Sequence, residues 1–276
     1  MKKLLFMVLF LLTILVGCAS EKEINFEDGK LIVGLEAAYS PFNWLENEAT
    51  ESNHPLDGMN AFVEGYDVQM AKLIAEELGL ELVIKRVEWK GIITALKTGM
   101  IDLIIAGMSP TEERLESINF SNSYYESDHV VIVRKDSIYA SATSIEDFTN
   151  AKVIGQKNTI YDDLAVQIVE ANTGSVHQTA LDTVPRIVNS INTGVSDITV
   201  VEKPVAISIV NNNENLMYID LTSDFVLDES DRVVSIGIRK VDSILLERVN
   251  VALGNISLET RENIMLSMLE VAPGDE

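Results

Sequence analysis

Short apolar runs alternate along this chain with longer stretches in which apolar residues recur at helical spacing. Strands are predicted at the short runs, residues 31–35, 82–87, 101–106, 130–133, 152–154, 197–201 and 233–238. Helices are predicted between and after them, at 68–78, 92–97, 161–171, 184–192, 244–253 and 259–269. This alternation is typical of βαβ units and therefore predicts an α/β fold with mainly parallel sheets.

The strand–helix rhythm comes in two clusters, the second of which begins at Lys152. A polar segment, residues 46–64, interrupts the first cluster and is predicted to be a surface excursion. A chain of 276 residues is long enough to build two units with a hydrophobic core in each. The pattern therefore predicts two lobes.

The first residues have the pattern of a secretion signal. Lys2 and Lys3 precede an apolar run, residues 4–16, which is shorter than the ~20 residues of a membrane span but suits a signal peptide. Small residues lead to Cys18, the only cysteine in the chain, as in a bacterial lipobox. We expect a signal peptide at 1–17, a palmitate-bearing diacylglyceryl anchor on Cys18 and a tether at 18–28. An ordinary secretory signal with an incidental cysteine is the alternative.

The charge balance argues against several classes of partner. The chain carries a net charge of −22, which becomes −24 when the two lysines of the signal peptide are removed. Nucleic-acid binding requires Lys and Arg to neutralise phosphates, and an acidic surface is also repelled by anionic lipid, so neither is an expected partner. A cationic ligand is compatible with this charge, because an acidic protein raises the local concentration of cations.

Signatures of catalysis and of cofactor binding are absent from the sequence. His54, His129 and His177 are scattered without the spacing of a zinc site. Neither a P-loop, a G-x-G-x-x-G motif nor a G-x-S-x-G motif is present. We therefore expect no catalytic residue, no metal and no cofactor, and the three histidines are interpreted as surface or packing residues.

A buried strand followed by a turn of small residues stands out at 104–114. Ligands of α/β sheets bind at the carboxyl ends of strands, and Gly107 and Ser109 occupy such a position. Their backbone N–H groups could receive a carboxylate that Arg114 clamps with two hydrogen bonds. A plain helix N-cap at Ser109 or Thr111, with Arg114 in a surface ion pair, explains the same residues equally well.

Six segments carry motifs in a fixed order: GLEAAYSPF at 34–42, GYDV at 65–68, WKGIITAL at 89–96, AGMSPTEER at 106–114, FSNSYY at 120–125 and VEKPVA at 201–206. Together they resemble the polar amino-acid family of solute-binding proteins, bacterial extracellular solute-binding family 3. Two of the segments are especially similar to arginine-binding lipoproteins of streptococcus-like bacteria. The resemblance implies a type II periplasmic-binding-protein-like fold with a ligand cleft between two lobes and two hinge crossovers.

The implied first lobe comprises residues 29–133 and 230–276, and the implied second lobe comprises residues 134–229. The crossovers are expected at 133–136 and at 227–233. The resemblance also implies that one amino acid is held between the lobes and that the lobes close around it.

Carried onto matching positions, the resemblance implies a complete ligand site. Ser109 and Arg114 hold the α-carboxylate, and Glu202, where the family usually has Asp, accepts the α-ammonium. The predicted ligand-binding residues are Glu36, Tyr39, Trp89, Ala106, Gly107, Met108, Ser109, Arg114, Gln156, Thr159 and Glu202. The sequence departs from the family at Ile160, where many relatives have a second hydroxyl, and at Ala106, where some have one.

The side chain of the ligand is expected to lie between Tyr39 and Trp89, with Glu36 at its far end, which favours a cationic amino acid. Arginine is the first candidate, and lysine, histidine and glutamine are alternatives. Core packing for Tyr39 and Trp89, and a solvated position for Glu36, are the competing interpretations of these three residues.

The function that the resemblance implies is that of a monomeric extracytoplasmic lipoprotein, anchored to the cell membrane, that delivers an amino acid to the permease of an ABC importer with its ATPase. Two other functions compete with it. One is a lyase or dehydratase of the same fold, in which Glu36 or Glu202 acts as an acid or base. The other is a surface lipoprotein for adhesion.

Overall fold

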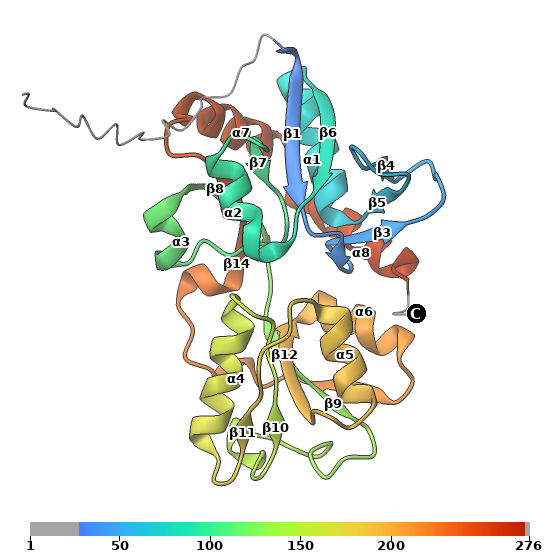
Figure 1. Ribbon diagram of the computed structural model, residues 1–276, viewed down its shortest axis with the longest axis vertical. Coiled ribbons are helices and arrows are strands. Elements are labelled where there is room, and N and C mark those ends of the chain that lie inside the picture. Colours follow the sequence, from blue (N-terminus) through green and yellow to red (C-terminus); the bar gives the residue numbers. More distant parts are fainter. Residues whose placement is uncertain (1–27, 274–276) are drawn as a thin grey trace, which may run out of the picture.

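The computed structural model describes residues 28–273 and consists of two lobes, each built around its own five-stranded sheet (Figure 1). In the first lobe the strand order is β6-β1-β7-β14-β8. The bounds are β1 (Lys30–Leu35), β6 (Glu81–Arg86), β7 (Leu103–Ile104), β8 (Asn119–Glu126) and β14 (Val233–Ile238). Strand β1 runs parallel to β6 and β7, whereas β14 runs antiparallel to β7 and β8. The predicted α/β class is thereby confirmed.

The sheet of the second lobe has the order β11-β10-β12-β9-β13. Its strands are β9 (His129–Arg134), β10 (Lys152–Val153), β11 (Val176–His177), β12 (Ile198–Glu202) and β13 (Leu216–Ile219). Strand β10 runs parallel to β11 and β12, and β9 runs antiparallel to β12 and β13. In each sheet, one strand therefore runs antiparallel to both of its neighbours. It is β14 in the first lobe and β9 in the second.

A small third sheet extends the first lobe, with the order β2-β3-β5-β4. Its strands are β2 (Ala38–Tyr39), β3 (Asn43–Glu46), β4 (His54–Pro55) and β5 (Phe62–Glu64). The polar segment 46–64, predicted as an excursion from the sheet, thus contains two strands of its own.

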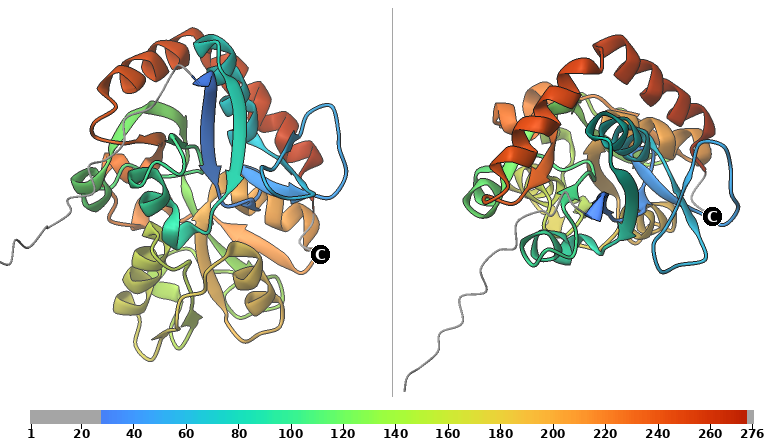
Figure 2. Two further views of the ribbon diagram at one scale, coloured as in Figure 1. Left: turned by 45° about the horizontal axis from the view of Figure 1, so that its top comes forward. Right: turned by 90° about the horizontal axis from the view of Figure 1, so that it is seen from above.

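Helices cover both sheets. The first lobe has α1 (Tyr66–Leu78), η2 (Trp89–Gly91), α2 (Ile92–Lys97), α3 (Glu112–Ser117), α7 (Ser243–Asn255) and α8 (Leu258–Val271). The second has η3 (Ile145–Asp147), α4 (Ile160–Ala171), α5 (Val184–Asn192), α6 (Lys203–Asn212) and η4 (Thr222–Asp224), and η5 (Glu229–Arg232) precedes β14. Figure 2 shows α7 and α8 along one side of the first lobe. None of the helices between residues 28 and 273 is long and apolar enough to cross a bilayer.

Helix α1 follows directly from the sequence pattern. Val68, Ala71, Ala75 and Leu78 recur at helical spacing and are all buried. The helix ends at Gly79, whose φ of 68° is left-handed and whose N–H bonds to carbonyls of the last turn. Glycine adopts this conformation without the steric cost of a side chain, so the stop is encoded locally.

The chain crosses between the sheets earlier than predicted. Strand β8 ends at Glu126 in the first sheet, and β9 begins at His129 in the second, so the first crossing is at residues 127–128. The predicted crossover at 133–136 is wrong, because residues 129–133 of β9 pair with β12 and Arg134 pairs with Leu216 of β13. An apolar strand in one sheet looks the same in sequence as one in the other, so the pattern could not place it. The chain returns between β13 and β14, over residues 220–232.

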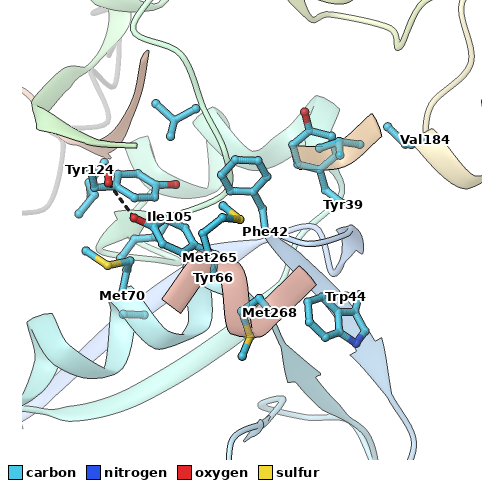
Figure 3. Close-up of a cluster of buried hydrophobic side chains, with 14 of the residues drawn as sticks. Tyr39, Phe42, Trp44, Tyr66, Met70, Ile105, Tyr124, Val184, Met265 and Met268 are labelled. Carbon is cyan, nitrogen blue, oxygen red and sulfur yellow. Dashed lines mark hydrogen bonds between the residues drawn. The ribbon is translucent and has the colours of Figure 1, made fainter. Parts of the chain in front are cut away.

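The two lobes are in direct contact around Tyr39 and Phe42. The rings of these two first-lobe residues stack with centroids 5.4 Å apart. Both residues belong to a continuous buried apolar cluster that includes residues from both lobes. Figure 3 shows Met265 and Met268 of α8 reaching the same cluster near Phe42 and Trp44. A side-chain hydrogen bond of 3.0 Å between Ser40 and Ser208 also joins the lobes. The structure is therefore a closed arrangement of the two lobes.

Candidate ligand site between the lobes

A small cavity, of about 20 Å³, lies between the lobes. Its walls are Glu36, Tyr39, Trp89, Ala106, Gly107, Ser109 and Arg114 from the first lobe, and Gln156, Thr159, Ile160 and Tyr161 from the second. Every predicted ligand-binding residue except Met108 and Glu202 is on this wall. Met108 instead packs in the core of the first lobe, because its side chain is on the opposite side of the turn.

Three short connections that follow parallel strands form most of this wall. Glu36 follows β1, the turn 105–109 follows β7, and the loop 154–159 follows β10. Strands β1 and β7 are parallel neighbours, so their carboxyl ends meet at one edge of the sheet. Such an edge is where α/β sheets bind ligands, because loops diverge there and leave a crevice.

Arg114 is held in the cavity by two backbone carbonyls. Its Nη1 donates to the Ser109 carbonyl at 2.8 Å, and its Nη2 donates to the Asn158 carbonyl of the second lobe at 3.2 Å. The guanidinium also lies 5.2 Å from the centre of the Trp89 ring. Thr111 caps α3 by accepting from the Arg114 N–H, so this turn is an N-cap and also places Arg114 in the cavity.

One expected anion donor is already engaged. The Gly107 N–H donates to the Tyr124 hydroxyl at 3.1 Å, so the prediction that this N–H receives a carboxylate is wrong. Gly107 has a φ of 59°, and a Cβ there would lie 2.9 Å from the Tyr39 ring. The glycine therefore allows Tyr39 to pack directly on the turn.

Asn158 receives two hydrogen bonds from the other lobe. In addition to Arg114, the Trp89 indole donates to its carbonyl at 3.0 Å. Asn158 has a φ of 62°, a left-handed conformation that asparagine tolerates better than most residues. This backbone conformation aims the carbonyl at the first lobe.

Thr159 and Gln156 shape the wall from the second lobe. Thr159 caps α4 by accepting from the Tyr161 N–H, and its hydroxyl donates to the Gln156 carbonyl at 2.8 Å. The Gln156 amide donates across the cleft to the Glu36 carboxylate at 3.3 Å and to the Asp182 carbonyl at 3.1 Å.

Glu202 is a buried carboxylate behind two tyrosine hydroxyls. It is 2 % exposed, and the Tyr39 hydroxyl donates to it at 3.3 Å and to the Tyr161 oxygen at 3.0 Å. Burial raises the pKa of Glu202 to about 8, although hydrogen bonds from Tyr161 and Tyr39 oppose the shift. Tyr161 was missed from the sequence. Its signal was its position two residues after Thr159, in the first turn of the helix that Thr159 caps.

Glu36 and Arg114 lie at different ends of the cavity. Glu36 also borders an outer hollow with Arg86 and Asp182, whereas Arg114 borders a separate hollow with Asp231. Burial raises the pKa of Glu36 to about 7, and its hydrogen bond from Gln156 and the nearby Arg86 charge lower it in part. The cavity thus has a fixed positive charge at one end and an ionisable carboxyl at the other.

The groups on this wall are complementary to a molecule with a carboxylate, an amine and a second positive group, since each would meet a group of complementary charge or a hydroxyl. Phe42 supports Tyr39 from behind, so Tyr39 both packs on the core and forms part of the wall. Between residues 28 and 273, no group of at least three His, Cys, Asp or Glu side chains could bind a metal ion.

Comparison with known proteins identifies relatives of this arrangement. Residues 31–266 match the family of bacterial extracellular solute-binding proteins, family 3. The arginine-binding extracellular protein ArtP of Bacillus subtilis is 31% identical over 166 residues, a match that spans 59% of each chain.

Two solved structures share the fold. The substrate-binding protein AbpA of Streptococcus pneumoniae Canada MDR_19A, bound to L-arginine, has a TM-score of 0.74 and 25% identity, covering 89% of this chain and 97% of that one. An ancestral arginine-binding protein bound to glutamine has a TM-score of 0.70 and 28% identity, covering 87% of this chain and 97% of that one.

Proposed function

Because the chain belongs to the bacterial extracellular solute-binding proteins, family 3, we propose that it captures arginine between its lobes for an ABC importer. The observation that carries the proposal is the placement of Arg114 and Glu36 at different ends of one interlobe cavity. Arg114 pairs with the α-carboxylate and Glu36 pairs with the guanidinium. Related proteins bound to arginine or to glutamine support an amino acid of this length.

The α-ammonium is received next to Tyr39 and Tyr161, with Glu202 behind them. The tyrosine oxygens contact the ammonium. The Glu202 carboxylate accepts hydrogen bonds from the two tyrosine hydroxyls and supplies the negative charge. A buried zwitterion needs partners at both ends, because an unpaired buried charge costs several kcal/mol. The longer side chain of Glu202, compared with aspartate, allows it to act through the hydroxyls.

Ligand capture is coupled to closure of the lobes, and no bond chemistry takes place. The ligand stabilises the closed form because only that form brings the second-lobe groups to its ammonium. Charged hydrogen bonds contribute ~1.5–3 kcal/mol each, so three such contacts supply roughly 4.5–9 kcal/mol, and the −8.2 kcal/mol of a micromolar ligand also needs packing against Tyr39 and Trp89.

Calorimetric titration of residues 21–276, refolded to remove bound ligand, tests this proposal. Arginine should bind more tightly than lysine, histidine, glutamine or citrulline. Arg114→Ala should weaken arginine binding by roughly 100-fold, from the loss of a charged contact of ~3 kcal/mol. Lys30→Ala, at an exposed lysine at the start of β1 and away from the cavity wall, is the control and should leave binding unchanged. Equal effects of the two variants contradict the site.

The same samples separate binding from catalysis. A lyase or dehydratase would use Glu36 or Glu202, two carboxyls at the site whose pKa values burial raises, as acid or base. Mass spectrometry of arginine after prolonged incubation should recover it unchanged. Conversion to a product, lost in Glu202→Gln, would replace the binding function by an enzymatic one.

Delivery to the importer is proposed to occur at the membrane, through a lipid on Cys18, which lies outside the described residues. Cys18→Ser should abolish incorporation of labelled palmitate and release the protein from bacterial membranes. Incorporation that persists in the variant contradicts the anchor. Loss of arginine uptake in cells that carry Arg114→Ala would link the binding site to the permease.

A further inference from the structure

Asp67 is a buried carboxylate that none of the proposed ligand contacts uses. It lies in the first turn of α1, is 0 % exposed and accepts from the Tyr124 hydroxyl at 2.6 Å and from the Asn43 amide at 2.8 Å. Burial raises its pKa to about 7, against the effect of these hydrogen bonds. Burial of a carboxylate destabilises the folded state, so the presence of Asp67 here needs an explanation beyond packing.

On one side, Asp67 is connected to the loop that carries Glu36. The side-chain amide nitrogen of Asn43 donates to Asp67, and its side-chain oxygen Oδ1 accepts from the Ala37 N–H at 2.7 Å. Ala37 has a φ of 57°, so this loop adopts a backbone conformation that alanine rarely takes. The hydrogen bond from its N–H is therefore well placed to hold it.

On the other side, Asp67 is connected to the turn that precedes Ser109 and Arg114. Tyr124 donates its hydroxyl proton to Asp67, and the same oxygen accepts from the Gly107 N–H at 3.1 Å. Figure 3 places Tyr124 beside Tyr66 in the apolar cluster beneath the site. Asp67 is thus the centre of one chain of hydrogen bonds from Ala37 to Gly107.

We infer that Asn43, Asp67 and Tyr124 are positioning residues that fix the distance between the two ligand loops of the first lobe. The inference rests on the proposed function, since one loop carries Glu36 and the other leads to Ser109 and Arg114. These groups contact opposite ends of the ligand, so the spacing of the two loops sets the length of side chain that the site accepts. Asp67 acts through its neighbours and does not touch the ligand.

The discriminating test removes one hydroxyl from each of two stacked tyrosines. Tyr124→Phe breaks the chain of hydrogen bonds, whereas Tyr66→Phe removes a hydroxyl that donates only to the Tyr124 carbonyl at 2.8 Å. Arginine and homoarginine, which is one methylene longer, are titrated into both. Tyr124→Phe should lower the arginine preference at least about fivefold, because a loosened spacing tolerates the longer ligand, while Tyr66→Phe should change it less than about twofold.

A rescue variant distinguishes positioning from packing. Asp67→Asn places an amide N–H₂ against the Asn43 amide or the Tyr124 hydroxyl and should reduce arginine affinity by roughly tenfold or more. The exchange Asn43→Asp with Asp67→Asn reverses the direction of the hydrogen bond between these two side chains, while their oxygens still accept from the Ala37 N–H and from the Tyr124 hydroxyl. It should restore affinity and length preference to within about threefold of the starting protein. A double variant no better than Asp67→Asn contradicts the inference.

Hydrogen exchange at the Ala37 and Gly107 amides tests the connection without any ligand. Both amides should exchange faster in Tyr124→Phe than in Tyr66→Phe at matched global stability. Failure of the unaltered protein to bind any amino acid would reject the proposed function alone, and the exchange data would still decide whether the chain of hydrogen bonds holds both loops. Equal exchange and an equal change in preference in the two variants would overturn the inference.

Discussion

Glu36→Gln isolates the contribution of one carboxylate to ligand selectivity. The change keeps the size of the side chain and its place beside Gln156, but removes the charge that is proposed to meet the guanidinium. Citrulline is the matched ligand, because its neutral ureido group has nearly the shape of guanidinium. The expected result is a selective loss of arginine affinity, with citrulline affinity changed less than about threefold.

The magnitude follows from two opposing contributions. A hydrogen bond between charged groups contributes ~1.5–3 kcal/mol, which corresponds to roughly 10- to 150-fold in affinity. Glu36 must first be ionised, and its pKa of about 7 in the ligand-free protein means that ionisation costs little at pH 8. At pH 6 the same step costs ~1.4 kcal/mol, one pKa unit's worth. The effect of the substitution should therefore be several-fold larger at pH 8 than at pH 6.

Calorimetry in two buffers of different ionisation enthalpy measures both the affinity and the protons released. Arginine should lower the pKa of Glu36, so binding should release protons near pH 6–7 and tighten as the pH rises. Glu36→Gln should reduce the number of protons released. Arginine and citrulline losing affinity equally, or proton release unaltered by the substitution, would show that Glu36 does not face the cationic end of the ligand.

Three further outcomes follow from the structure. Asn158→Gly should retain binding, because glycine adopts a φ of 62° freely. Asn158→Val should lose ~1–2 kcal/mol of stability in thermal melting and should weaken arginine binding. Equal melting temperatures of the two variants would contradict backbone strain at residue 158. Phe42→Ala should cost ~3–5 kcal/mol in denaturant unfolding, since the ring is fully buried behind Tyr39, and a loss under 1 kcal/mol would contradict that packing role. Because burial raises the pKa values of Glu36 and Glu202 in the folded ligand-free protein, its stability should fall as the pH rises from about 5 to 8, and arginine should raise the melting temperature more at pH 8 than at pH 6.

The first-lobe half of the site could be predicted from sequence because it depends on local order. Glu36 and Ser109 follow apolar runs directly, and parallel neighbouring strands bring such ends together. Arg114 lies within one turn of the helix that Thr111 caps, so its position is set by short-range geometry. The family motifs placed the remaining residues, but their orientation depends on packing.

The second-lobe half was less predictable, because it depends on which side chains face each other across the closed cleft. Glu202 lies behind the hydroxyls of Tyr39 and Tyr161 and not on the cavity wall. Tyr161 is on the wall in its place. The Gly107 N–H looked free in the sequence, but it donates to Tyr124, which comes from a distant strand. The early crossing at 127–128 was hidden for a related reason, since β8 and β9 are both strands and only their partners differ.

One of the contacts between the lobes is made by a peptide carbonyl, that of Asn158, and not by a side chain. The contacts from Trp89 and Arg114 depend on backbone conformation at residue 158 and leave the far end of the cavity untouched. Glu36, in contrast, joins the lobes through its own side chain, because Gln156 donates to it across the cleft, so a substitution there changes the far end of the cavity and a contact between the lobes together.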